Sequence, residues 1–407
     1  MFGHLLRRLP VVSAMAALVV LAAAACSSGG SSAAGSSAGA GAAPIKIGAI
    51  CTCSGFSSET AMVSTYKAWV AQTNAAGGIN GHQLQLLVED DAGNPGKSVT
   101  AAHTLVGKHV LAIVDMTNDD ETWASYVATA KIPVVGGGTS TTPMFTNPDF
   151  YPEGQTEQAL FPSIVQSAKT AGATNLGLIY CAEAVQCQEG IQPLKDTGKS
   201  LGLPVVYAGE VSATAPNYTA QCVAAKQAGV TALFIADITA VAEKVAGDCA
   251  QQGYHPIYVV DGEILANQFL TAAGLKDSLV SPSPNLPYFA DAPAVTAMNT
   301  ALDKYAPGLR TNATDFTEIA DEGWVSGLLF GAAAKAGGLG AGGGEPTSAQ
   351  LVAGLTALKG ETLDGFAPPL TFAAGKAHPI GCWFVTEVKA GAFSVPNGTT
   401  PTCVTTQ

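Results

Sequence analysis

Short apolar runs alternate with helical stretches along most of the chain from residue 45 onward, and this alternation constrains the fold more than any other feature. The runs are rich in Val and Ile, as in IKIGAI, VLAIVD, NLGLIY, ALFIAD and PIYVVD. The stretches between them have the length of roughly 10 to 15 residues that is typical of connecting helices. The sequence therefore predicts an α/β fold in which helices cover both faces of parallel sheets, with ligands binding beyond the carboxyl ends of the strands.

The length of the chain predicts two lobes. Residues 44–407 exceed the size of about 250–300 residues at which a single hydrophobic core usually stops growing. Near the end, the run GCWFVTEVKAGAFSV alternates between apolar and polar residues. This alternation is typical of an antiparallel hairpin.

The N-terminal segment predicts export. Arg7 and Arg8 precede an apolar run that ends just before Cys26, which is the order found in a signal peptide, here residues 1–25. The small residues before Cys26 resemble the lipobox of bacterial lipoproteins, in which that Cys receives lipid, although Ala23 stands where most lipoboxes have Leu. An ordinary cleaved signal beside a free Cys is the alternative.

A Ser/Gly/Ala-rich linker, residues 26–43, follows the signal. Such a composition predicts a flexible tether that would hold the folded part roughly 20–25 Å from its anchor. We expect an extracytoplasmic protein on the outer face of the cell membrane, held there only through a lipid on Cys26. The formal net charge of −12 argues against nucleic acid or anionic lipid as a partner.

Cysteine usage supports the export reading. Nine cysteines less the one at the lipobox leave an even set, which suits an oxidising compartment. Local spacing suggests three disulfides, namely Cys181–Cys187, Cys222–Cys249 and Cys382–Cys403. For Cys51 and Cys53 a bridge, two free thiols and a metal-binding pair all stay open, because a Cys-x-Cys bridge is strained. Two thiolates alone make a poor zinc site, so no metal is predicted.

The stretch EDDAGNPGKS ends like a nucleotide-binding P-loop but lacks its chemistry. Asp91 occupies the position of the first glycine, where a carboxylate would repel phosphate, and Pro95 removes one N–H donor. The chain also has no Gly-x-Ser-x-Gly, His-Glu-x-x-His or paired Cys-x-x-Cys motif. We therefore predict neither an enzyme nor a cofactor, and no catalytic residues.

A family resemblance enters with residues 76–106, AGGINGHQLQLLVEDDAGNPGKSVTAAHTLV. This segment resembles a signature of the branched-chain amino-acid (Leu/Ile/Val-type) substrate-binding proteins of ABC importers. The segments IGAICTCSG, IPVVGGGTSTTP and VVDGEILAN resemble further landmarks of that family, and they fall in the family's order. The resemblance covers most of residues 45–330.

The resemblance implies a type I periplasmic-binding-protein fold. That fold has two Rossmann-like lobes, with parallel sheets flanked by helices, joined by three hinge crossings around a ligand cleft. Carried over, the first lobe is residues 44–160 plus 290–366. The second lobe is residues 161–289 plus 367–407.

The resemblance also implies ligand-binding positions. In the first lobe these are Asn118 and Asp119 after a strand, and a turn of three hydroxyl residues, namely Thr139, Ser140 and Thr141. In the second lobe Glu263 matches the acid that pairs with the ligand ammonium. A zwitterion needs donors at one end and an acid at the other, because a desolvated charge must be paired.

Two departures limit the transfer. At two positions where the family usually has an aromatic residue over the ligand, this chain has Ile238 and the segment near Cys187. The aromatic residues that could take over this role are Trp123, Tyr180, Phe289 and Trp324. Of these, Trp324 is included in the predicted site. Three acids in TNDDET, residues 119–121, stand where the family more often has Ser and Gly. They would either select a cationic or amide ligand or, as we favour, cap the following helix.

These observations predict an extracytoplasmic solute-binding lipoprotein. It would capture a small polar solute and deliver it to an ABC permease. The solute would be a branched-chain or other amino acid, or an amide or urea-like compound. The protein itself is expected to be a monomer. The alternatives are a sensing receptor that uses the same fold and a secreted hydrolase.

Overall fold

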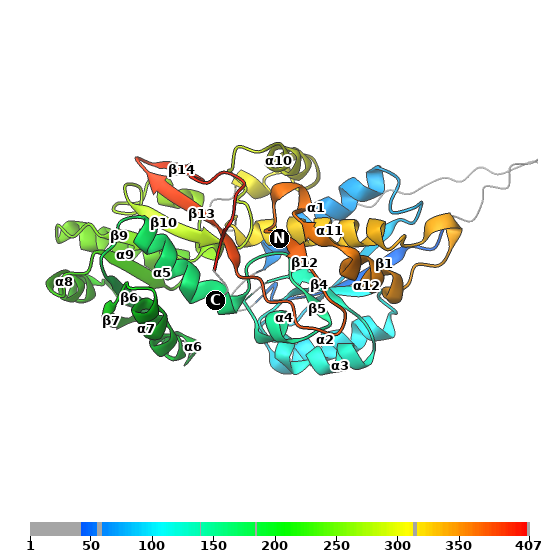
Figure 1. The fold of residues 1–407 in the computed structure, drawn as a ribbon, viewed down its shortest axis with the longest axis horizontal. Helices are drawn as coiled ribbons and strands as arrows, with labels where there is room; N and C mark the ends of the chain where they lie inside the picture. The colour runs from blue at the N-terminus through cyan, green and yellow to red at the C-terminus, as the bar shows by residue number, and fades with distance from the viewer. Residues whose placement is uncertain (1–41, 55–58, 139, 184, 312–315, 405–407) are drawn as a thin grey trace, which may run out of the picture. The chain divides into compact units, whose positions relative to one another are not determined.

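The computed structural model describes residues 42–54, 59–138, 140–183, 185–311 and 316–404 (Figure 1). The predicted signal peptide, the predicted lipidation site Cys26, nearly all of the tether and Thr139 lie outside these residues. The described chain is an α/β protein with two main sheets, as the sequence predicts. Among the described residues, no helix combines the length and the apolar character that crossing a membrane requires.

The first sheet is parallel throughout and has the strand order β2-β1-β3-β4-β5. Its strands are β1 (Ile45–Cys51), β2 (Leu84–Asp90), β3 (Ala112–Met116), β4 (Val134–Gly137) and β5 (Phe150–Tyr151). The connecting helices are α1 (Thr60–Ala75), α2 (Pro95–Gly107), α3 (Ala124–Thr129) and α4 (Thr142–Thr146). Each connection returns the chain to the same edge of the sheet, so that the next strand runs parallel to the previous one, as the strand–helix alternation requires.

The second sheet has the order β14-β13-β10-β9-β8-β6-β7, and β15 also pairs with β13. Its parallel strands are β6 (Leu176–Cys181), β7 (Val205–Val211), β8 (Ala232–Ala236), β9 (Ile257–Val259) and β10 (Leu279–Ser283). The antiparallel strands are β13 (Cys382–Lys389), β14 (Ala392–Ser394) and β15 (Thr402–Cys403). The β13–β14 pair is the predicted C-terminal hairpin. The helices are α5 (Leu160–Thr170), α6 (Val185–Glu189), α7 (Ile191–Ser200), α8 (Thr219–Gln227) and α9 (Thr239–Gln251).

Three later helices and a short hairpin return to the first sheet. They are α10 (Pro293–Tyr305), α11 (Ile319–Ala336), α12 (Ser348–Ala357), β11 (Lys359–Glu361) and β12 (Leu370–Thr371). Short 3-10 turns are η1 (Asp120–Thr122), η2 (Glu157–Ala159), η3 (Gly262–Ile264), η4 (Asn267–Leu270), η5 (Leu309–Thr311), η6 (Ala341–Gly343) and η7 (Leu363–Gly365). The side chains of α10 to β12 share one core with α1 and β1, and this core includes Leu370 and Phe372.

The chain therefore passes three times between two lobes: between β5 and α5, between β10 and α10, and between β12 and β13. This confirms the predicted two-lobe fold. Because the crossings lie at strand ends, the segments that join the lobes also border the edge where ligands bind in α/β sheets.

The stretch EDDAGNPGKS, which resembles a P-loop in sequence, forms the end of β2 and the start of α2. Asn94 caps the helix by accepting a hydrogen bond from the backbone N–H of Lys97 at 3.0 Å, and Pro95 occupies the first helical position, where its missing N–H costs nothing. The Asp91 carboxylate accepts hydrogen bonds from the hydroxyls of Thr52 and Thr117. Asp91 therefore ties the ends of β1 and β3 together.

The eight cysteines among the described residues are all paired. Cys222 on α8 and Cys249 on α9 form a fully buried disulfide, and Cys382 on β13 pairs with its cross-strand neighbour Cys403. Cys181–Cys187 is also bridged. For the pair that the sequence left open, Cys51 and Cys53, the structure has a disulfide.

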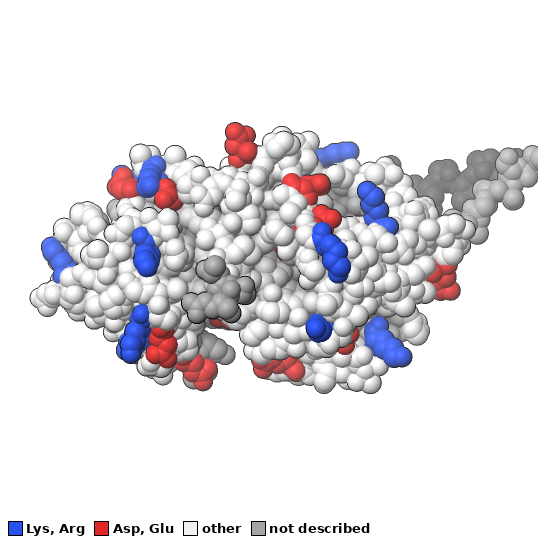
Figure 2. Space-filling view, in the orientation of Figure 1, with Lys and Arg blue, Asp and Glu red and all other residues white. Residues whose placement is uncertain are grey.

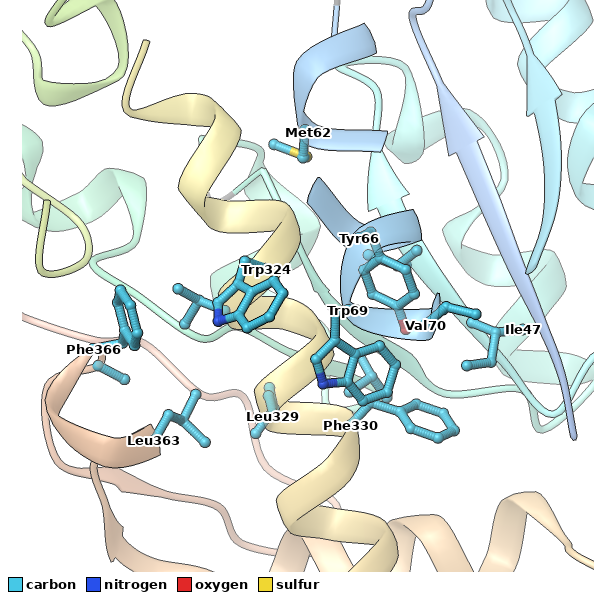
Figure 3. Packing of buried hydrophobic residues seen from close by; sticks show 14 of the residues in the cluster. Ile47, Met62, Tyr66, Trp69, Val70, Trp324, Leu329, Phe330, Leu363 and Phe366 are labelled. Carbon is cyan, nitrogen blue, oxygen red and sulfur yellow. The ribbon is translucent and has the colours of Figure 1, made fainter. Parts of the chain in front are cut away.

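Helices α1 and α11 cross closely in the core of the first lobe (Figure 3). Tyr66 and Trp69 of α1 pack edge-on, and Trp69 also packs against Phe330 of α11 with ring centroids 6.1 Å apart. The close approach depends on glycine, because a Cβ atom at Gly323 would overlap the backbone carbonyl of Met62.

Gly323→Ala should therefore destabilise the protein by about 1–3 kcal/mol, the usual cost of overpacking, although alanine is the better helix former. Gly331→Ala is the matched control on the same helix, because its added Cβ would lie 3.5 Å from the nearest atom of Trp69; this change should stabilise by up to about 1 kcal/mol. Urea unfolding measures both. Equal effects at the two positions would contradict the packing account.

Candidate ligand-binding site

A cavity of about 500 Å³ lies at the carboxyl ends of strands from both sheets. The first lobe contributes Asn118 and Ser140, which follow β3 and β4, and the second lobe contributes most of the wall. Its apolar lining residues are Leu160, Phe161, Leu178, Leu194, Phe234, Ile235, Ile238 and Ile264. The volume is within the range of about 300–1,000 Å³ typical of small-molecule sites. A hollow of about 600 Å³ beside α11 is lined by first-lobe residues only, so it lacks the two-lobe character of a cleft.

Three of the seven predicted ligand contacts line this cavity, namely Asn118, Ser140 and Glu263. Asp119 is not among its lining residues, and Thr139 lies outside the described residues. Thr141 is 8% exposed and donates its hydroxyl hydrogen to the Asp120 carboxylate at 2.6 Å. Trp324 is 3% exposed and belongs to the core of the first lobe. The structure thus brings together residues from the two lobes and leaves Trp324 apart from them.

The acids of TNDDET do not act as the helix cap that the sequence favoured. Asp119 makes no side-chain cap hydrogen bond to η1, and no cap hydrogen bond begins α3. Asp120 is instead fully buried against Asp115, and burial together with Asp120 raises the pKa of Asp115 well above its usual range. Because two buried carboxylates repel each other, the protonated form of Asp115 is favoured, and Thr141 donates a hydrogen bond to Asp120.

The aromatic side chains that line the cavity belong to residues that the sequence analysis did not single out. Phe161 and Phe234 line the cavity, and the Cys181–Cys187 disulfide lies in its wall. Trp123 is buried and donates its indole N–H to Ser98, while Phe289 stacks on Phe393 with ring centroids 4.0 Å apart. No short-range pattern marks Phe161 or Phe234, because both belong to ordinary apolar helical and strand runs.

Carboxylates dominate the polar lining of the cavity. Asp261 and Glu263 belong to the turn after β9, and Glu157 lies in the first crossing between the lobes. The Asp261 carboxylate accepts a hydrogen bond from the backbone N–H of Glu263 at 3.2 Å, which fixes the turn. No Lys, Arg or His is among the described residues that line this cavity. The polar lining of the cavity is therefore mainly acidic.

Further buried acids stand behind this lining, on the first lobe. Glu318 and Glu322 belong to the start of α11, and Glu59 precedes α1; all three are less than a tenth exposed. The Glu318 carboxylate accepts a hydrogen bond from the Ser283 hydroxyl at 2.9 Å through one oxygen, while its other oxygen has no partner. Neither carboxylate oxygen of Glu322 has a hydrogen-bond partner.

Burial shifts the pKa of each of these acids upward. It raises the pKa of Glu59 to about 7, that of Glu157 to about 8 and that of Asp261 to about 6. The pKa of Glu263 lies well above its usual range because of burial first and of the neighbouring acids, beginning with Asp261, second. Like charges that cannot reach water hold protons, so a bound cation would compete with protons for this site.

The acids are too dispersed to hold a metal ion. Among the described residues, no group of three or more His, Cys, Asp or Glu side chains is arranged to ligate a metal. On the face of the molecule shown in Figure 2, charged residues of both signs are scattered without a continuous basic patch.

A two-lobed α/β fold with a cavity at the strand ends and lined from both lobes defines a binding protein for small solutes. The family model for periplasmic binding proteins matches residues 44–392. The chain belongs to that family.

Solved structures show the same fold at low sequence identity. A substrate-binding periplasmic protein from Ralstonia solanacearum is 20% identical with a TM-score of 0.68, and the match covers 86% of this chain and 98% of that one. A branched-chain amino acid ABC transporter protein from Thermus thermophilus with bound valine is 13% identical with a TM-score of 0.74, covering 87% and 95%. A solute-binding protein from R. palustris in complex with benzoate is 14% identical with a TM-score of 0.66, covering 88% and 97%. No curated protein matches the chain.

Proposed function

We propose that this protein is a lipid-anchored, extracytoplasmic receptor that captures a small amine-bearing solute between its lobes and delivers it to an ABC permease. The observation that carries the proposal is the cavity lined by Asn118 and Ser140 from one lobe and Glu263 from the other. A ligand that contacts both lobes stabilises the closed arrangement, so that the permease can distinguish the loaded receptor from the empty one.

The charge of the cavity favours an amine over an acid. The R. palustris protein holds benzoate, an anion, whereas the described lining here has carboxylates and no basic side chain. An anion would leave its charge unpaired in this cavity, and an unpaired buried charge is costly. A branched-chain or other amino acid fits if backbone N–H groups and Ser140 receive its carboxylate.

A thermal-shift panel of amino acids, amines, amides, urea and carboxylates tests the binding role. A true ligand present at about 100 times its dissociation constant should stabilise the protein by about 2.7 kcal/mol. The loaded receptor should then stimulate ATP hydrolysis by the permease in vesicles, with the solute recovered unchanged. If no solute in the panel stabilises the protein, or if the solute is converted to a product, the receptor proposal fails.

Glu263→Gln should weaken an amine-bearing ligand by about 10- to 100-fold, because the change removes one charge-assisted hydrogen bond. Isothermal titration measures this loss. Glu345→Gln, an exposed acid on the first lobe, is the control and should leave the affinity unchanged. Unchanged affinity in Glu263→Gln would remove Glu263 from the binding site.

A further inference from the structure

The cavity has a second acidic position, distinct from the turn that holds Asp261 and Glu263. Asp237 follows β8 and lines the same cavity. One of its carboxylate oxygens accepts a hydrogen bond from the backbone N–H of Ile238 at 2.8 Å, and the other is buried without a hydrogen-bond partner. A buried acceptor left unpaired is costly, so Oδ2 of Asp237 is placed to receive a ligand donor.

Each acidic position comes two residues after a core residue, and these two core residues pack on different faces of the second sheet. Along β8, Phe234 packs in the core that faces α5, while Ile235 packs in the core that faces α8 and α9. Asp237 comes two residues after Ile235, just beyond the end of β8. Asp261 comes two residues after Val259, just beyond the end of β9, and Val259 packs on the α5 side.

The charges that each acid experiences agree with this separation. Burial raises the pKa of Asp237 to about 6, with a smaller contribution from Glu183. The charge of Asp237 contributes, after burial, to the raised pKa of Tyr218, which packs on the side of α8 and α9. The charge of Asp261 contributes, after burial, to the raised pKa of Glu157, which lies just before α5. The two acids thus have different electrostatic neighbours, with the apolar side chains of the cavity lining the space beside them.

The first acidic position also has an unsatisfied acceptor directed at it. Oε2 of Glu318 is buried and unpartnered, and a Cβ atom placed on Gly262 would lie 2.5 Å from it. Gly262 is the residue between Asp261 and Glu263. The Glu318 carboxylate of the first lobe therefore packs against the acidic turn of the second lobe.

We propose that the solute is a dication, in which two positively charged nitrogens are separated by an apolar segment, as in an α,ω-diamine. One nitrogen is bound by Asp261 and Glu263, and the other by Asp237, with the chain between them against Phe234 and Leu178. This inference rests on the receptor proposal and specifies its substrate class. A zwitterion fits less well, because Thr141, expected to receive a ligand carboxylate, already donates to Asp120.

Isothermal titration of the full chain with unbranched α,ω-diamines, with monoamines of the same lengths and with leucine tests the inference. We expect the best diamine to bind about 10- to 100-fold tighter than its monoamine, the contribution of one charge-assisted hydrogen bond. Asp237→Asn should abolish this preference by weakening the diamine to about the affinity of the monoamine, and Asn keeps the oxygen that accepts from Ile238, so the turn should stay folded. Glu263→Gln should weaken both amines.

Asp277→Asn is the matched control, since it removes an exposed acid from the same lobe, where Asp277 pairs with Lys276 at 2.7 Å. It should leave all affinities unchanged, and an equal loss in this variant would overturn the proposal in favour of a general field effect. A monoamine that binds as tightly as the diamine, or a diamine preference that survives Asp237→Asn, would also overturn it.

If leucine binds and the diamines do not, the dication inference fails while the receptor proposal stands. If no solute of the wider panel binds, the receptor proposal fails.

Discussion

The free energy of unfolding of the ligand-free protein should fall as the pH rises from about 5 to about 8, which is the reverse of ordinary acid denaturation. Burial raises the pKa of Glu153 from 4.5 to about 8, and the acids around the cavity are shifted in the same direction. Between these values the folded protein keeps a proton that the unfolded chain releases. Each such group then lowers the free energy of unfolding by about 1.4 kcal/mol for every pH unit between its pKa in the unfolded chain and its pKa in the folded protein.

Glu153→Gln isolates the contribution of one group. Glu153 is fully buried and accepts hydrogen bonds through Oε1 from the Ser326 hydroxyl at 3.1 Å and from the backbone N–H of Gly137. Glutamine keeps this acceptor and does not ionise. The variant should therefore resemble the wild type at pH 5 and exceed it in stability at pH 8 by up to about 4 kcal/mol.

Urea unfolding across the pH range measures this difference. The exposed acid Glu345 again provides the control, and Glu345→Gln should keep the pH dependence of the wild type. A wild-type protein that becomes more stable between about pH 5 and 8, or a Glu153→Gln variant with an unchanged slope, would contradict the account of buried, protonated acids.

Loss of the Cys222–Cys249 disulfide should cost about 3–4 kcal/mol. The bridge closes a loop with a sequence separation of 27 residues, and the chain-entropy relation assigns about this much to a loop of that length. Both cysteines are fully buried, so the Cys222→Ala/Cys249→Ala double variant avoids burying new polar atoms but leaves a small cavity, which adds to the cost.

The Cys181→Ala/Cys187→Ala double variant is the matched comparison, because its bridge spans only 6 residues and should contribute about 2 kcal/mol. Chemical denaturation of both variants under oxidising conditions measures the two losses. If the short bridge costs as much as the long one, the entropic explanation is wrong for this protein.

The fold was largely predictable because its signals are local. Runs such as ALFIAD and PIYVVD encode strands by composition and length, and the cysteine spacings identify pairs on neighbouring elements, as Cys222 and Cys249 on α8 and α9 show. The start of α2 at Asn94 and Pro95 was readable for the same reason, since helix caps depend on a few adjacent residues.

The sequence predicted residues of the cavity lining only at positions to which the family resemblance could be carried over. Glu263, Ser140 and Asn118 line the cavity, whereas Thr141 is bound by Asp120 and Trp324 is enclosed in the core. No local pattern marks Glu157 or Asp237 as site residues, because an acid after a strand or before a helix is common at ordinary solvated positions.

The sequence by itself determined the α/β class, the two-lobe division and three of the disulfides, because these depend on the period, length and spacing of residues close in the chain. Only the tertiary structure decided which acids share the cavity, how Cys51 and Cys53 are paired, and that Asp115, Asp120 and Glu153 are buried. The physical reason is that burial and charge proximity arise between segments far apart in sequence, such as Glu318 and Gly262. They exist only after the chain has crossed between the lobes.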